Sequence, residues 1–328
     1  MSSNIPVYSE PEQLVLDFFI QEDQEGHKYS QSIELYDAIP KYFWGKPPRD
    51  SGGYLPILRR EFKHKGVAYE VEIFPARLSK KVKGIEIEQE YYPGAREEII
   101  EDALRKIATE SRAQRIDKRY GLRFSLSELK KELKRTGHAF NNTQIKDALK
   151  ICAGSKIELK SKSNGAKMAV TQSIFPLYGE VERKDWLKTK AQFAVEFHTL
   201  VTRSIEQNTF RQINYERSMR ISNSLARWLH KRMSHNYRQA QTFSNAYTIT
   251  LSTILRDSGI TPRERLSDSR KAVKKALEEL QQQDVIFQWE EVEVKDGRKL
   301  AEVKFILKPT ITFSQEMKRA NAKTKAIR

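Results

Sequence analysis

Two stretches of the chain gather side chains that can bind phosphate and read the edges of DNA bases. Lys and Arg neutralise phosphate, while Arg, Asn and Gln can also pair with a base edge through two hydrogen bonds. The first stretch supplies Asn142, Thr143, Gln144, Lys146 and Lys150. The second supplies Arg263, Arg265, Ser267, Arg270, Lys271, Lys274 and Lys275. Because residues three and four apart share a helix face, each set predicts a basic face on a helix that lies in a groove of DNA.

Two turns downstream of these stretches add further cations. Asn164-Gly165 and Asp296-Gly297 lie between alternating runs, and both dipeptides are strong signals for a tight β-hairpin. The cations near the first turn are Lys160, Lys162 and Lys167, and those near the second are Lys295, Arg298 and Lys299. We therefore expect two hairpins whose cations contact the DNA backbone beside the groove.

Residues that could perform catalysis are scattered along the chain. The six histidines form no His-x-His pair of the kind found in rolling-circle nickases, and no Gly-x-x-x-x-Gly-Lys-Ser/Thr sequence indicates a P-loop. Cys152 is the only cysteine, which excludes an internal disulfide and a multi-cysteine zinc site. Glu291 and Glu293 could share a strand face and bind a metal, but alternating charge on an open strand face is common. We expect no catalytic residue, no metal and no cofactor.

The positive charge is unevenly distributed. The 328 residues carry 59 Lys+Arg and 43 Asp+Glu, a formal net charge of +16. Residues 1–90 hold 12 and 15 of these, and residues 91–328 hold 47 and 28. A basic excess suits a polyanion partner, although a lysine-rich helix face alone is more often only solvated. Without a long apolar run or a signal peptide, the chain is expected to be cytoplasmic.

The elements that must hold the first basic set follow a definite order. A helix over residues 95–116 comes first, because its apolar residues recur at three- and four-residue spacing. Ser127 and Asn142 are expected to cap the two short helices that follow, and Gly137 separates these helices. The strands predicted around them span residues 123–125, 156–162 and 168–178.

The second basic set lies in the same order of elements. A long helix over residues 217–234 is followed by a strand at 247–249 and a helix from Thr250 or Ser252 to Gly259. Ser267 is expected to cap a helix over 268–282, and the hairpin strands span 285–294 and 300–307. By their spacing, Trp228 and Phe287 are expected in the core.

Helix, short strand, two helices and a hairpin form the winged helix-turn-helix unit. The predicted fold class is α+β, with two tandem winged-helix domains at residues 95–190 and 191–315. Residues 1–94 are predicted to form a β-rich N-terminal segment of unknown role, with extended runs at 30–36 and 68–74. Residues 316–328 are expected to be a flexible basic tail.

The doubled unit resembles the plasmid replication initiators of the Rep family. The resemblance is carried by the helix at 217–234, above all Ser-Leu-Ala-Arg-Trp-Leu-His-Lys-Arg at 224–232, and by the stretch from Tyr247 through Gln283 to the second hairpin. It implies binding to repeated sites in a plasmid origin, with the second unit as the chief major-groove reader. It also implies a monomer–homodimer equilibrium through the first unit, repression of the protein's own gene, and contacts with the host initiator and helicase.

We therefore hypothesise a non-enzymatic, sequence-specific binder of double-stranded DNA that initiates plasmid replication. A winged-helix transcription regulator or partition protein with the same modules is the alternative that fits the same pattern. An origin nickase or primase is the alternative from another class, because residues 1–94 remain unassigned.

Overall fold

Two large hydrophobic cores organise the described part of the chain. The first core runs from Leu35 to Met219 and the second from Ile221 to Met317. The computed structural model describes residues 31–82, 84–108, 114–116, 119–161, 168–181, 193–206, 213–237, 245–261 and 265–326. Within these ranges, no helix has both the length and the apolar character that crossing a bilayer requires.

We call the elements around the first core the first body and those around the second core the second body. Strands from both sides of residue 94 form one sheet in the first body. The strands β1 (Leu58–His64), β2 (Val67–Phe74), β7 (Lys156–Ser161) and β8 (Met168–Ser173) lie in the order β1-β2-β7-β8, and all neighbours are antiparallel. Positive φ angles at Lys65 and Gly66 turn the chain between β1 and β2. Because β2 pairs with β7, the domain boundary expected at residue 94 crosses a continuous sheet and a continuous core.

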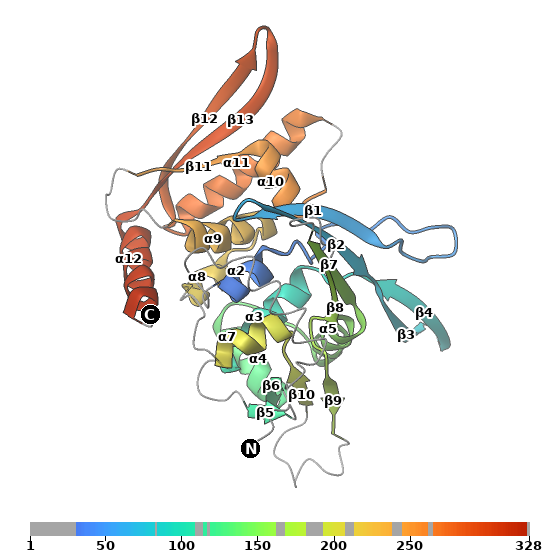
Figure 1. Cartoon of the computed structure of the whole chain (residues 1–328). Coiled ribbons are helices and arrows are strands. Elements are labelled where there is room, and N and C mark those ends of the chain that lie inside the picture. Colours follow the sequence, from blue (N-terminus) through green and yellow to red (C-terminus); the bar gives the residue numbers. More distant parts are fainter. Residues whose placement is uncertain are drawn as a thin grey trace, which may run out of the picture.

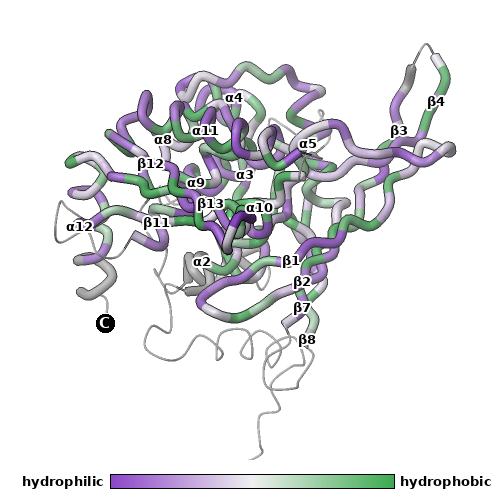
Figure 2. The backbone as a smooth tube through the Cα atoms, turned by 90° about the horizontal axis from the view of Figure 1, so that it is seen from above, coloured by the Kyte–Doolittle hydropathy of each residue, from purple (hydrophilic) through white to green (hydrophobic). Residues whose placement is uncertain are grey.

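The remaining elements of the first body enclose this core. Its helices are α2 (Gln31–Ala38), α3 (Ala95–Ile107), α4 (Leu126–Arg135), α5 (Asn142–Gly154) and α7 (Thr199–Glu206). A second antiparallel sheet has the order β5 (Gln114–Ile116), β6 (Arg119–Phe124), β10 (Phe193–Glu196) and β9 (Tyr178–Glu180). The strands β3 (Ala76–Val82) and β4 (Ile85–Tyr91) pair only with each other, and their ribbon projects from the rest of the chain (Figure 2).

The second body contains the elements of the second unit in their predicted order. They begin with α8 (Tyr215–Arg220), whose Met219 is part of the first core. The others are α9 (Ser224–Asn236), β11 (Tyr247–Thr250), α10 (Leu251–Asp257), α11 (Leu266–Gln282), β12 (Ile286–Asp296), β13 (Lys299–Pro309) and α12 (Ile311–Ala326). The sheet order is β11-β13-β12, and α9 and α11 pack together beside it. The β12–β13 ribbon extends well beyond the end of β11, as Figure 1 shows at the top of the molecule.

Three helices begin at residues other than the expected caps. Ser125, not Ser127, caps α4 by accepting the backbone N–H of Glu128 at 3.2 Å. Asn141, not Asn142, caps α5, and α11 begins after Arg265 instead of Ser267. At each of these starts the earlier residue has the extended backbone that an N-cap requires.

Other predicted segments also differ from the structure. The helix expected over 95–116 ends at Ile107. The helix expected over 217–234 is two helices, α8 and α9. The second of them starts anew because Asn223 caps it by accepting the N–H groups of Leu225 and Ala226. The run predicted as extended at 30–36 is helical in its described part. The tail expected to be flexible forms most of α12, which buries Met317 in the second core.

Phe287 does not join the core. Its exposed fraction is 57%, whereas Trp228 is 8% exposed, as its spacing predicts. A β-bulge shifts the pairing register between Ile286 and Gln288. The bulge turns Phe287 outward, because one extra residue exchanges the two faces of a strand.

Candidate nucleic-acid interface

The helix α11 is fixed by its inner face and by the turn that precedes it. Val273 and Leu277 are buried in the second core. Gly259, between α10 and α11, has a φ of +73°, and a Cβ there would lie 2.7 Å from the Arg60 guanidinium and 2.9 Å from Pro40. Only glycine allows both this conformation and this approach. The turn after α10 therefore lies directly against the first body.

The outer face of α11 carries the exposed members of the second predicted set. They are Arg265, Ser267, Lys271 and Lys275. Lys271 lies 3.7 Å from Asp268, but its side chain is 78% exposed, so this contact is weak. Within the described part of the chain, Lys275 has no ion-pair partner. These side chains form an open polar and basic stripe along one helix face.

The other two cations of this helix are held by the hairpin strand β12. The Arg270 guanidinium contacts Glu291 at 2.7 Å and Glu293 at 2.9 Å, and Lys274 Nζ lies 2.6 Å from Glu291. Partial burial would raise the pKa of Glu291, but hydrogen bonds from Arg270 and Lys274 lower it, so the carboxylate stays charged. Glu291 and Glu293 thus bind cations of their own chain. No cluster of three or more metal-ligating His, Cys, Asp or Glu occurs in the described ranges.

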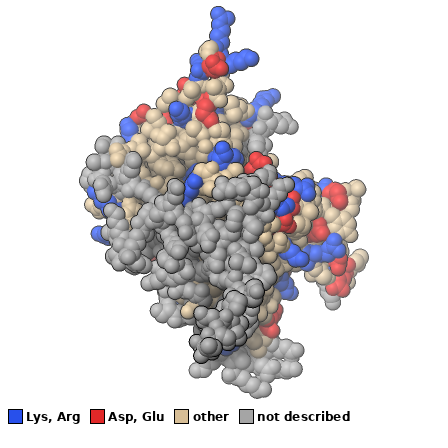
Figure 3. All heavy atoms as spheres, in the orientation of Figure 1, with Lys and Arg blue, Asp and Glu red and all other residues tan. Residues whose placement is uncertain are grey.

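The hairpin tip carries the three cations expected from the sequence. Lys295, Arg298 and Lys299 are exposed there, and Gly297 supplies the positive φ of the turn. Figure 3 shows Lys and Arg side chains at this tip, far from the bulk of the molecule. The tip therefore carries positive charge beyond the end of the three-stranded part of the sheet.

The corresponding helix of the first unit, α5, is covered on two sides. One face packs Ile145 and Leu149 into the first core. The other side meets the β3–β4 ribbon, where Ile151 packs with Ala76 and Leu78. An ion pair of 2.8 Å between Lys80 and Asp147 also joins the ribbon to α5. Only a strip of α5 between the ribbon and β9 faces solvent.

Two of the three described cations in the first predicted set form ion pairs within the chain. Lys146 forms an ion pair with Glu180 on β9, and Lys160 lies 3.0 Å from both Glu72 and Glu158. Gln144 accepts the Asn141 backbone N–H in a capping box. The exposed members are Asn142, Thr143, Gln144 and Lys150. Lys162, Lys167 and Arg263 lie outside the described residues.

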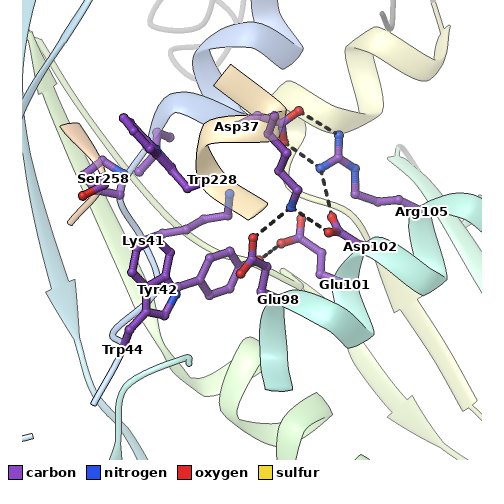
Figure 4. A pocket seen from close by; sticks show the side chains of 13 residues that line it. Asp37, Lys41, Tyr42, Trp44, Glu98, Glu101, Asp102, Arg105, Trp228 and Ser258 are labelled. Atoms are coloured by element: carbon purple, nitrogen blue, oxygen red, sulfur yellow. Dashed lines mark hydrogen bonds and ion pairs between the residues drawn. The ribbon is translucent and has the colours of Figure 1, made fainter. Parts of the chain in front are cut away.

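Buried charges join the two bodies between α3 and α9 (Figure 4). Lys231 Nζ contacts Glu98 at 2.9 Å and Asp102 at 2.6 Å, and Arg227 contacts Glu98 at 3.3 Å. Burial would lower the pKa of Lys231, but Asp102 and Glu98 raise it above its usual value, so Lys231 stays protonated. Tyr36 and Tyr42 donate to Glu101 in the same cluster.

Asp37 extends this cluster toward the second body. Its carboxylate lies 2.7 Å from Arg105 and 3.3 Å from His235. Burial would raise the pKa of Asp37, but Arg105 and His235 hold it well below its usual range. The sequence analysis did not identify this buried cluster. One signal for it is that the acidic side chains at positions 97, 98 and 101 have the helical spacing of buried positions. The cluster fixes α9, and through it α11, relative to the first body.

Comparisons with known proteins give structural neighbours only. No protein-family model and no curated protein sequence matches the chain. A selenomethionine form of domains 2 and 3 of RctB aligns with a TM-score of 0.47 and 9% identity over 81% of this chain and 94% of that one. A second structure of RctB domains 2 and 3 gives 0.43 and 9% over 84% and 96%. The Pi initiator protein in complex with iteron DNA gives 0.42 and 14% over 66% and 94%.

Proposed function

We propose that this chain is a sequence-specific binder of double-stranded DNA that initiates replication at repeated origin sites, with α11 as its major-groove reader. The observation that carries the proposal is the stripe of exposed Arg265, Ser267, Lys271 and Lys275 on a helix whose other face is locked into a core. A helix presented in this way, beside a ribbon with cations at its tip, has the arrangement of a groove-binding unit.

The side chains of this surface divide into two roles. Lys271 and Lys275 project from α11 and can reach base edges or phosphates. Arg270 and Lys274 hold β12 against α11 through Glu291 and so position the ribbon. We therefore expect Lys271 and Lys275 to contribute more to DNA affinity than Arg270 and Lys274, which must leave Glu291 before they can bind phosphate.

The replication part of the proposal rests on the Rep-family resemblance of residues 217–283. In that reading the same DNA contacts repress the protein's own gene, and a monomer–homodimer equilibrium selects between repression and initiation. The host initiator and helicase are the proposed protein partners, and the bacterial cytoplasm is the proposed site of action. The proposed role is non-enzymatic and uses no cofactor.

The proposed sequence-specific DNA binding is tested with DNA fragments taken from beside the gene. We expect direct repeats there to be bound, and replacing Lys271 or Lys275 by Ala to weaken binding by ~1–3 kcal/mol where the side chain reads a base. A pure phosphate contact would instead weaken binding to all sequences alike. Unchanged binding after both replacements together would exclude α11 as the reader.

Transformation separates an initiator from a regulator. The gene and its flanking DNA on an otherwise non-replicating fragment should replicate autonomously if the chain is an initiator. Binding to the repeats without replication would instead support the transcription regulator or partition protein. A metal-dependent nicking and priming assay on supercoiled DNA should be negative, and a product that depends on the protein would favour the nickase or primase.

A further inference from the structure

A cleft of about 930 Å³ lies between the two bodies on one side of α11. Its first wall is the loop from Phe43 to Pro48, together with the start of β1 and Tyr92. Its second wall includes the start of α9 and the residues Ile260, Thr261, Ala272 and Lys275. The cleft therefore joins the proposed reading helix to a part of the chain that the Rep-family resemblance does not cover.

The charge of the cleft is positive. Lys46, Arg59 and Lys275 line it, and no Asp or Glu is among its described lining residues. Lys46 is exposed and, like Lys275, has no ion-pair partner in the described ranges. Arg59 contacts Glu72 at 2.8 Å, but its side chain is 70% exposed, so this pair is weak and can exchange for another anion.

The loop that carries Lys46 is tied down at its base. Arg49 donates to the carbonyls of Gly53 and Glu90 at 2.7 Å each. The Phe43 backbone N–H donates to the Pro93 carbonyl at 2.8 Å, and Pro47 and Pro48 restrict the backbone after Lys46. Because the loop is already ordered, little conformational entropy is lost when it binds a ligand.

The position of the cleft relative to α11 indicates its ligand. Arg270 and Lys274 lie on the flank of α11 that faces the ribbon, whereas Ala272 and Lys275 lie on the opposite flank, in the cleft. A major groove has a phosphate strand on each side, about 12 Å apart. With α11 in the groove, the ribbon meets one strand and the cleft meets the other.

We propose that this cleft binds the sugar–phosphate backbone of the DNA strand opposite the ribbon, through Lys46 and Lys275 with Arg59 beside them. This inference rests on the proposed function and adds a second, sequence-independent contact to it. Residues 43–59 thereby become part of the DNA-binding surface, and the DNA is held between the ribbon and this loop.

Affinity and its salt dependence test the proposal. For the intact chain and a 30-base-pair duplex of random sequence, Lys46→Ala should weaken binding about 3- to 10-fold near 0.1 M salt. It should also reduce the slope of log affinity against log salt by about 1, which corresponds to one lost phosphate contact. Lys46→Glu should weaken binding further. The matched control is Lys131→Ala, an exposed lysine on α4, far from α11 in Figure 1.

A placement experiment gives an independent readout. Cys152 is fully buried, so Lys46→Cys introduces an accessible thiol that can carry an iron chelate. The labelled protein should cut the bound duplex, whereas the same label at Glu88→Cys, on the exposed part of β4, should not. Equal cutting from both positions would overturn the proposal.

The outcomes separate this inference from the function on which it rests. Suppose that the unmodified chain binds DNA and that Lys46→Ala and Lys131→Ala have the same affinity and the same salt slope. This result would overturn the cleft contact alone. Failure of the unmodified chain to bind any duplex would overturn both.

Discussion

The helices α11 and α5 occupy the same place in the order of their units, after a strand and a short helix and before a hairpin. They differ in what surrounds them. The outer face of α11 is open, with the ribbon on one flank and the cleft on the other. The β3–β4 ribbon packs against one flank of α5, and its Lys146 on the other flank is paired with Glu180. Two similar basic patterns thus give one open face with two exposed lysines and one narrower strip whose central Lys146 is paired.

This difference suggests a division of labour between the units. A helix that reads a major groove needs a wide free face, because the groove walls rise on both of its sides. The exposed strip of α5 lies between the ribbon and β9, so less of this helix is free to contact a groove. We therefore expect α11 to provide most of the sequence reading and α5 to contribute little.

The largest expected effect comes from removing the open cations of α11. Replacing Arg265, Lys271 and Lys275 together by Ala should weaken binding to the repeats by more than about 100-fold, since a side chain that reads a base contributes ~1–3 kcal/mol. Fluorescence anisotropy at fixed salt measures this directly.

The matched control removes three side chains from the open strip of α5. Replacing Thr143, Lys146 and Lys150 together by Ala should change binding less than about 3-fold, because Lys146 is already paired with Glu180. An equal loss from both triple variants would show that the two helices read DNA alike.

The second prediction concerns the core beneath α11. His230 is fully buried on α9, and burial lowers its pKa to about 3. In the unfolded chain its pKa is about 6.5, so protonation favours unfolding. The stability due to neutral His230 is complete above about pH 6.5 and is lost as pH falls toward 3, at up to ~1.4 kcal/mol per pH unit. Between pH 7 and pH 5 we expect a loss of about 2 kcal/mol in urea unfolding.

His230→Phe isolates this contribution, because phenylalanine keeps a ring at the site but does not titrate. Other groups titrate equally in both proteins, so the difference between their losses reports His230. An equal loss of stability in both proteins between pH 7 and pH 5 would show that His230 is not the origin of the slope.

The smallest expected effect comes from replacing the acidic residues that form ion pairs with the cations of α11 and α5. Glu291→Gln releases Lys274 from β12 and leaves Arg270 with Glu293 as its one remaining partner there. It should tighten binding to random-sequence DNA by about 3- to 10-fold, because Lys274 and the loosened Arg270 can contact phosphate. Glu180→Gln releases Lys146 on α5 and should change binding less than about 2-fold. Both are measured at low salt, and a larger gain from Glu180→Gln would contradict the proposed difference in access.

Much of the second unit could be predicted from the sequence because its signals are local. The spacing of Leu225, Trp228 and Leu229 identifies the buried face of α9, and Asp296-Gly297 locates the hairpin turn. The open stripe on α11 follows from the same periodicity. The exact start of a helix is harder to predict, since Asn141 and Asn142 are chemically equivalent caps and only backbone geometry separates them.

Features that depend on distant segments could not be predicted in this way. No local pattern indicates that β2 pairs with β7, or that the β3–β4 ribbon covers α5. The pairing of Arg270 with Glu291 joins residues on different elements. Lys46 lies in a loop whose composition indicates only a turn, and its place beside α11 depends on how the two bodies meet.

The buried charges between α3 and α9 also restrict how this chain can change over generations. Losing Glu98 alone would leave Arg227 without its carboxylate partner and Lys231 with Asp102 alone, and breaking a buried pair in this way costs about 3–5 kcal/mol. Replacing such a set together by apolar side chains of similar volume is often neutral. Each intermediate step is therefore selected against although both end points are viable. We expect descendants of this sequence to inherit these charges, or lose them, as a group.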